Sequence, residues 1–193
     1  KSQILTLGFV MLGIFLMFLI LFRNLKISLI GVIPNFIAAF AILGLIGIFL
    51  MFLILFRNVK ISLIGVIPNF IAAFAILGLI GLLNIPLDMM TITIAAITIG
   101  IAVDNSIHYI YRFIEEYKDE SNYNEAIKTC HSTVGIAILN TSITIVFGFS
   151  ILVMSNFIPT IYFGLFTGIA MLLAMVSVLT LLPSLLLKIK PFN

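Results

Sequence analysis

The feature that most limits the fold of this chain is a series of apolar runs, each long enough to cross a lipid bilayer as a helix. A crossing needs about 20 apolar residues, and the runs that meet this requirement after residue 60 are 61–82, 89–111, 133–154 and 161–187. Hydrophobic residues make up 63% of the 193 residues, which is more than one soluble core of this size could bury. We therefore expect an all-α, polytopic transmembrane helical bundle in contact with the lipid bilayer.

The placement of the cations predicts an orientation. The connections 82–88 and 155–160 contain no Lys or Arg, whereas basic residues flank the apolar runs elsewhere, at Arg23, Lys26, Arg57, Lys60, Arg112, Lys118, Lys128, Lys188 and Lys190. Positive residues concentrate in cytoplasmic connections. We therefore expect a multi-pass protein of the cell's inner (plasma) membrane, with Arg112–Ser132 and the C-terminus in the cytoplasm. The net charge of +3 gives no reason to expect a nucleic-acid partner.

The connection 112–132 is the one substantial polar stretch. Asn122 followed by Glu125 is a capping-box pattern, which predicts a short helix over Tyr123–Cys130 within a cytoplasmic linker helix region, 113–132. We interpret its charged residues, and also Cys130 and His131, as parts of a solvated linker. Because Cys130 is the sole cysteine, an intrachain disulfide is excluded.

A near-identical tandem repeat marks the first part of the chain. The 34-residue segments 13–46 and 47–80 differ only in having Leu25 in one copy and Val59 in the other. Solenoid repeats rarely reach such identity, so the repeat reflects either a recent duplication or an error in reconstructing the sequence. We expect an N-terminal region of apolar spans, 1–60, that contains the first copy, followed by a four-span bundle, 61–193.

The repeat also creates a conflict in topology. As one helix, 27–56 would extend about 45 Å, which is too long for a single crossing of a hydrocarbon core of about 30 Å and too short for two. We expect one long helix from about Asn35 to Phe56, and with one copy removed the spans would alternate cleanly as five. Since the chain starts at Lys1, we also expect it to be a piece of a longer protein.

Asp104 is the main candidate functional residue, because it lies inside an apolar run. The other six acidic residues all lie in polar connections. A charge at this depth costs roughly 3 kcal/mol or more, so such residues usually face a bundle interior and serve an ion or proton path. The alternative is that Asp104 only hydrogen-bonds between helices.

Residue spacing predicts the surroundings of Asp104. Gly100, Asp104 and His108 share a helix face, and Gly100 would admit a neighbouring helix that presses against Asp104. The expected neighbour is 133–154. The candidate proton relay comprises Asp104, Asn105, His108, Asn140, Thr141 and Thr144, and the candidate packing glycines are Gly100, Gly148, Gly164 and Gly168. Judged alone, the polar residues of 133–154 fit packing better than a relay, and His108 fits a relay or the membrane interface equally.

Catalytic and cofactor motifs are missing from the sequence. It contains no glycine-rich phosphate loop, no nucleophile–base pair and no cluster at metal-ligand spacing. We therefore expect neither enzyme activity nor a cofactor.

The segment Ile99–Glu116, IGIAVDNSIHYIYRFIEE, resembles the fourth transmembrane helix of the resistance–nodulation–division (RND) superfamily. Within this superfamily, the segment most resembles the MMPL-type exporters, which are related to the sterol-sensing domain of Patched-like proteins. The resemblance covers about residues 61–190. It continues through Asn124-Glu-Ala-Ile127, Gly135-x-Ala137, Asn140-Thr-Ser142, Phe147-Gly-Phe149, Phe163-Gly-Leu165 and Leu182-Pro183.

The resemblance implies part of a proton-driven transporter, comprising helices 2–6 of an RND-type half with one repeat unit duplicated. In this family two halves pack as parallel repeats and the fourth-helix aspartate carries the proton, which assigns that role to Asp104. The implied partners are the missing other half, in the same chain or an oligomer, and a hydrophobic or lipid substrate. Many members have a second acidic residue or a tyrosine beside the aspartate, whereas this chain has Asn105, which leaves two-proton coupling in doubt.

The leading hypothesis is therefore the membrane part of an exporter of lipids or other hydrophobic molecules, driven by the proton-motive force. One alternative is a sterol-sensing-like, lipid-binding or regulatory membrane domain. Another is an accessory subunit of Sec-type protein translocation.

Overall fold

The structure is a computed structural model that describes residues 12, 16, 43–85 and 89–192. Four described helical segments are long and apolar enough to cross a membrane, and all regular structure in the described residues is helical. These observations confirm the predicted all-α bundle. The chain divides into two compact units, Lys1–Ile48 and Phe49–Asn193. The expectations for the first apolar run and for residues 35–42 lie outside the described residues, whereas Leu43–Phe56 is helical as expected.

The first labelled helix, α3 (Val59–Leu82), begins immediately after Asn58. The Asn58 side-chain oxygen accepts hydrogen bonds from the backbone N–H groups of Lys60, at 2.9 Å, and Ile61, at 3.2 Å. These bonds satisfy donors that the first turn of a helix leaves unpaired. The helix lies close to the predicted span 61–82.

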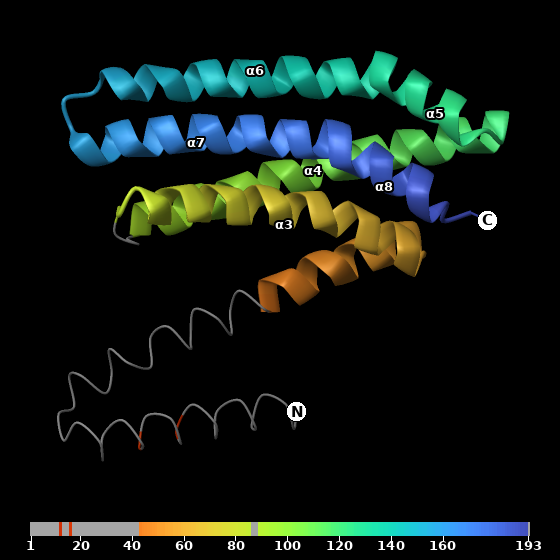
Figure 1. Ribbon diagram of the computed structural model, residues 1–193, viewed down its shortest axis with the longest axis horizontal. Helices are drawn as coiled ribbons and strands as arrows, with labels where there is room; N and C mark the ends of the chain where they lie inside the picture. The colour runs from red at the N-terminus through yellow and green to blue at the C-terminus, as the bar shows by residue number, and fades with distance from the viewer. Residues whose placement is uncertain (1–11, 13–15, 17–42, 86–88, 193) are drawn as a thin grey trace. The chain divides into compact units, whose positions relative to one another are not determined.

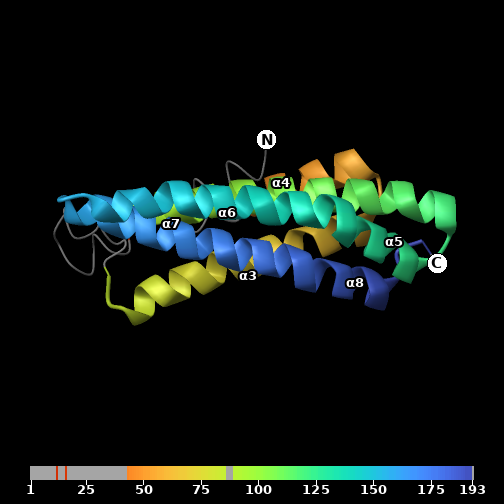
Figure 2. The same cartoon turned by 90° about the horizontal axis from the view of Figure 1, so that it is seen from above.

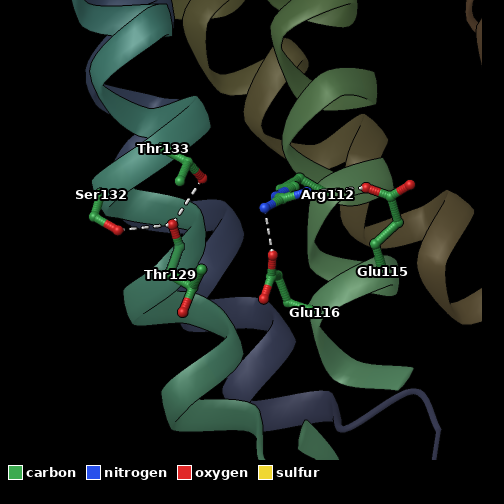
Figure 3. Close-up of polar contacts among 6 residues, drawn as sticks. All are labelled: Arg112, Glu115, Glu116, Thr129, Ser132 and Thr133. Atoms are coloured by element: carbon green, nitrogen blue, oxygen red, sulfur yellow. Dashed lines mark hydrogen bonds and ion pairs between the residues drawn. The ribbon is translucent and has the colours of Figure 1, made fainter. Parts of the chain in front are cut away.

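Helix α4 (Met89–Glu120) continues beyond Tyr111, where the apolar run ends. The helix does not end at Tyr111 as expected for the predicted span 89–111, and the first part of the expected linker, as far as Glu120, continues α4. The Arg112 guanidinium contacts the carboxylates of Glu115, at 3.4 Å, and Glu116, at 2.6 Å, along the same helix (Figure 3). Pairs at these spacings stabilise exposed helix, which explains why α4 persists after its apolar residues end.

Helix α5 (Tyr123–Cys130) has the bounds predicted from the capping pattern. The Asn122 side chain caps it by accepting a hydrogen bond from the Asn124 N–H at 3.0 Å. The helical path continues through a π-helical segment, η1 (His131–Gly135), into α6 (Ile136–Ser150) and a short 3-10 turn, η2 (Ile151–Met154). At the α5–η1 junction the Thr129 carbonyl accepts bonds from the hydroxyls of Ser132 and Thr133 (Figure 3).

The last membrane-length helical path is also interrupted once. Helix α7 (Ile158–Val176) is followed by a second π-helical segment, η3 (Ser177–Leu181), and by α8 (Leu182–Ile189). Together these elements contain the predicted span 161–187.

Within the unit Phe49–Asn193, α7 lies beside α3, α4 and α6, and the four helices run lengthwise (Figures 1 and 2). A core of Ile76, Ile80, Ile94, Phe166 and Ala170 joins α3, α4 and α7. Helix α6 is peripheral, because only 11% of the most apolar stretch of Tyr123–Met154 is buried. The corresponding share in α3 is 50%.

We call the end of this unit where α3 begins and α4 ends the basic end. Helices α5 and α8 also lie there (Figure 1). All cations of the unit's described residues belong to these segments, namely Arg57, Lys60, Arg112, Lys118, Lys128, Lys188 and Lys190. The described parts of the α3–α4 and α6–α7 connections lie at the other end and carry no Lys or Arg.

Candidate functional site

Asp104 and His108 lie together on an exposed face of α4. The Asp104 Oδ1 atom is 3.6 Å from the His108 Nε2 atom, and the two side chains are 70% and 67% exposed, respectively. The opposite side of α4 is buried, where Ala102 packs with alanines of α3 and α7. Asn105, which the sequence grouped with Asp104, is 8% exposed and belongs to this buried side. The candidate carrier therefore faces away from the packed core.

The expected close approach of a helix at Gly100 is not found among the described residues. Gly100 is exposed, and no atom lies within 4 Å of the position that a Cβ would occupy. The four-residue spacing places Gly100 on the same face as Asp104 and His108, as predicted. Spacing along one helix, however, does not specify which neighbour covers that face.

The polar residues expected to face Asp104 lie instead on exposed parts of α6. Asn140, Thr141 and Thr144 are all exposed. The Thr141 hydroxyl donates to the Ala137 carbonyl at 2.8 Å, and the Thr144 hydroxyl donates to the Asn140 carbonyl at 2.9 Å. Helix α6 packs on α7 rather than on α4, so the prediction that α6 is the neighbour of the Asp104 face is wrong for this unit.

Of the two candidate glycines of α7, Gly164 permits the close packing of α6. A Cβ added at Gly164 would lie 2.6 Å from the Phe149 carbonyl oxygen and 2.7 Å from the Leu152 Cβ, so only glycine permits this approach. At Gly168 the nearest atom would be 3.9 Å away. Gly148, the candidate packing residue on α6, is exposed and has no such neighbour within 4 Å among the described residues.

A set of buried polar contacts between helices was not predicted from the sequence. The Ser106 hydroxyl on α4 donates to the Asn69 Oδ1 on α3 at 3.3 Å, and the Asn69 Nδ2 donates to the Gly65 carbonyl at 2.8 Å. The Ser177 hydroxyl of η3 donates to the Pro68 carbonyl at 2.9 Å. A Pro-Asn pair inside an apolar helix is the sequence signal that could have indicated this site, because proline removes a helical donor and a buried amide needs partners.

The contacts of His131 with other helices were also not predicted from the sequence. One ring nitrogen, Nδ1, lies 2.8 Å from the Tyr109 hydroxyl oxygen, and the other, Nε2, lies 3.1 Å from the Leu179 carbonyl oxygen. The residue therefore contacts α4 and η3 and is more than part of a linker. Among the described residues, no group of three or more His, Cys, Asp and Glu side chains is placed to hold a metal ion.

An apolar helical bundle with its cations at one end and a carboxylate on a membrane-length helix defines a polytopic membrane protein. Residues 34–191 match the MMPL family, and the chain therefore belongs to this family. No solved structure matches the chain.

Two curated relatives match part of the chain. The protein MJ1562 of Methanocaldococcus jannaschii, whose name describes it as a membrane protein, is 36% identical over 105 residues. The hopanoid transporter HpnN of Burkholderia multivorans is 32% identical over 112 residues. Each match covers 54% of this chain, but only 27% of MJ1562 and 12% of HpnN. The chain thus corresponds to a minor part of either relative.

Proposed function

We propose that the chain is the membrane part of an MMPL-type exporter of lipids or other hydrophobic molecules, driven by the proton-motive force, and that it is not an enzyme. Asp104 is the proton carrier. The observation that carries this proposal is the position of the Asp104 carboxylate on an uncovered face of α4, within the apolar run of that helix and 3.6 Å from an imidazole nitrogen.

The cost of exposing a carboxylate to lipid argues for a partner on this face. Charged residues in the membrane almost always face protein or water, and the described helices leave the Asp104 face open. The polar face of α6 around Asn140 and Thr144 is open as well. Both faces are accounted for if the other half of the transporter, from the same longer chain or an oligomer, covers them.

A carboxylate–imidazole pair can perform the proton step. Asp104 accepts a proton in its charged state, and His108 can both accept and donate one through its two ring nitrogens. Transfer of one charge across the membrane potential provides about 2.3 kcal/mol per 100 mV. Such a step can drive a conformational change that moves a hydrophobic cargo.

A lipid cargo is supported by the family and by one relative. HpnN is named as a hopanoid transporter, and a hopanoid is a hydrophobic molecule of the bilayer. We extend only this class of cargo to the present chain.

The proposal is tested with the full-length protein that contains this chain, reconstituted in vesicles with an imposed proton gradient. The cargo probes are a fluorescent phospholipid and a hopanoid. Asp104→Asn should insert normally but lose gradient-driven export, Asp104→Glu should retain part of it, and Asp119→Asn, a change at the basic end, should leave export unchanged.

Two results would contradict the proposal. Unchanged export by Asp104→Asn would rule out Asp104 as the carrier. Binding of the lipid probes without any response to the gradient would instead favour the sterol-sensing-like, regulatory alternative.

A further inference from the structure

His131 occupies a junction of several elements at the basic end. It is the first residue of η1, and its ring lies edge-on to Tyr109 of α4 with ring centroids 5.6 Å apart. Its Nε2 atom lies 3.1 Å from the Leu179 carbonyl in the middle of η3. One side chain therefore joins the two π-helical segments to each other and to α4.

The sequence removes one possible helical donor to the Leu179 carbonyl. In a continuing α-helix this carbonyl would accept a hydrogen bond from the N–H group of residue 183. Residue 183 is Pro183, which has no N–H group. His131 lies where it can supply the donor that the proline removes.

The contacts also define the tautomer of His131. A proton on Nε2 is donated to the Leu179 carbonyl, and Nδ1 then accepts a hydrogen bond from the Tyr109 hydroxyl, at 2.8 Å. The other tautomer would donate from Nδ1 to the Ile127 carbonyl, 3.1 Å away, and leave Leu179 without this donor. Only the first tautomer satisfies both contacts between elements.

These contacts close into a ring around the basic half of the bundle. From η3, Ser177 reaches the Pro68 carbonyl of α3, and the adjacent Asn69 contacts Ser106 of α4. Ser106 lies three residues before Tyr109, and the Tyr109 hydroxyl contacts the His131 Nδ1 atom. The ring thus includes α3, α4, η1 and η3, and passes within two residues of Asp104.

We infer that this ring is a conformational latch, with His131 as the residue that closes it. In the closed state it holds the π-helical segments together and fixes α4 to both of them. We expect opening of the ring to separate η1 from η3 and to expose Cys130, which directly precedes His131 and is fully buried. This inference does not rest on the proposed transport function, because latch opening is defined by contacts within this chain.

Cys130, the single cysteine of this chain, provides the measurement. The experiment uses the full-length protein that contains this chain, with any cysteine outside the chain replaced by serine, reconstituted in lipid nanodiscs. The rate at which N-ethylmaleimide labels Cys130 reports how often the latch opens. The loss of a hydrogen bond typically shifts such a local equilibrium about three- to tenfold. We expect His131→Ala to accelerate labelling by this factor. Tyr109→Phe keeps the contact between the aromatic side chains of residues 109 and 131, so it should accelerate labelling less.

A distant member of the ring separates a latch from a local effect. Ser177→Ala leaves the surroundings of the thiol intact but removes the bond to the Pro68 carbonyl, so it should also accelerate labelling. Ser132→Ala, which removes only a bond to the Thr129 carbonyl in the same helical path, is the matched control and should leave the rate unchanged.

General loosening of the bundle is checked with a second reporter. Ala170→Cys in a Cys130→Ala background places a thiol in the fully buried core of α7. Its labelling should stay slow in all four variants. The latch is refuted if His131→Ala or Ser177→Ala labels no faster than Ser132→Ala, or if the Ala170→Cys reporter accelerates by the same factor.

Discussion

The Asp104 carboxylate lies 3.6 Å from the His108 imidazole, one helical turn further along α4, and the described helices cover neither side chain. This pair places two polar, exposed side chains within the apolar run of α4. If it belongs to a proton path, the two residues should contribute unequally, because only Asp104 carries a negative charge that a proton neutralises.

His108→Gln tests this difference. Glutamine remains polar but does not take up a proton, so the variant should export more slowly by about two- to fivefold, the effect of losing one exposed contact between side chains of this kind, whereas Asp104→Asn should lose export entirely. Initial rates in the vesicle assay provide the comparison. Equal and complete loss in both variants would assign the two residues a single inseparable role and contradict this prediction.

Gly164→Ala should destabilise the α6–α7 pair. The added Cβ would lie 2.6 Å from the Phe149 carbonyl oxygen, and such overpacking costs about 1–3 kcal/mol. Unfolding by denaturing detergent measures the change. Gly148→Ala is the matched control, since the space around Gly148 is open, and it should be neutral or slightly stabilising because alanine favours helix. Similar destabilisation of both variants would show that close packing is not the cause.

The Asn69–Ser106 contact should appear as coupling in a double-mutant cycle. Interhelical hydrogen bonds in membranes contribute about 0.6 kcal/mol on average, so Asn69→Ala and Ser106→Ala together should cost less than the sum of the single changes by about this amount. Thr98→Val is the control, because its hydroxyl bonds to Ile94 of its own helix. It should combine additively with Asn69→Ala, and additivity in both pairs would argue against the contact.

Phe192, which follows α8, should stabilise the packing of this segment against α4 and α5. Its ring stacks on Tyr117 with centroids 5.0 Å apart, and its N–H group donates to the Tyr123 hydroxyl at 2.9 Å. Aromatic pairs contribute about 0.5–1.5 kcal/mol, so Phe192→Ala should speed hydrogen exchange in α5 several-fold. Phe147→Ala, at an exposed position of α6, should not change exchange in α5, and faster exchange there would contradict the assignment.

Local signals in the sequence predicted local structure well. The bounds of α5 followed from Asn122, because a cap acts on the turn that immediately follows it. The apolar runs likewise located the four long helices. The continuation of α4 beyond Tyr111 was missed because charged residues were read as a connection, although Arg112 and Glu116 have the spacing of a helical pair.

The candidate site was predictable along one helix but not between helices. The spacing of Asp104 and His108 was sufficient to place them together. Their neighbours depend on which faces of α3, α4, α6 and α7 pack, and nearly uniform apolar sequences give little indication of this. The roles of Ser177 and His131 were hidden for the same reason, since their partners lie 109 and 48 residues away in sequence, at Pro68 and Leu179.

The unbroken length of α4 has a mechanical consequence. Its 32 residues extend about 48 Å, whereas the hydrocarbon core of a bilayer is about 30 Å thick. A core of that thickness therefore leaves roughly 18 Å of α4 outside it, and the charged residues at 112–120 assign most of this length to the basic end. A tilt of about 10° at the membrane surface would displace the tip by about 3 Å over that length. A small change in the angle of the helix that carries Asp104 would therefore produce a larger displacement of its end at the membrane surface.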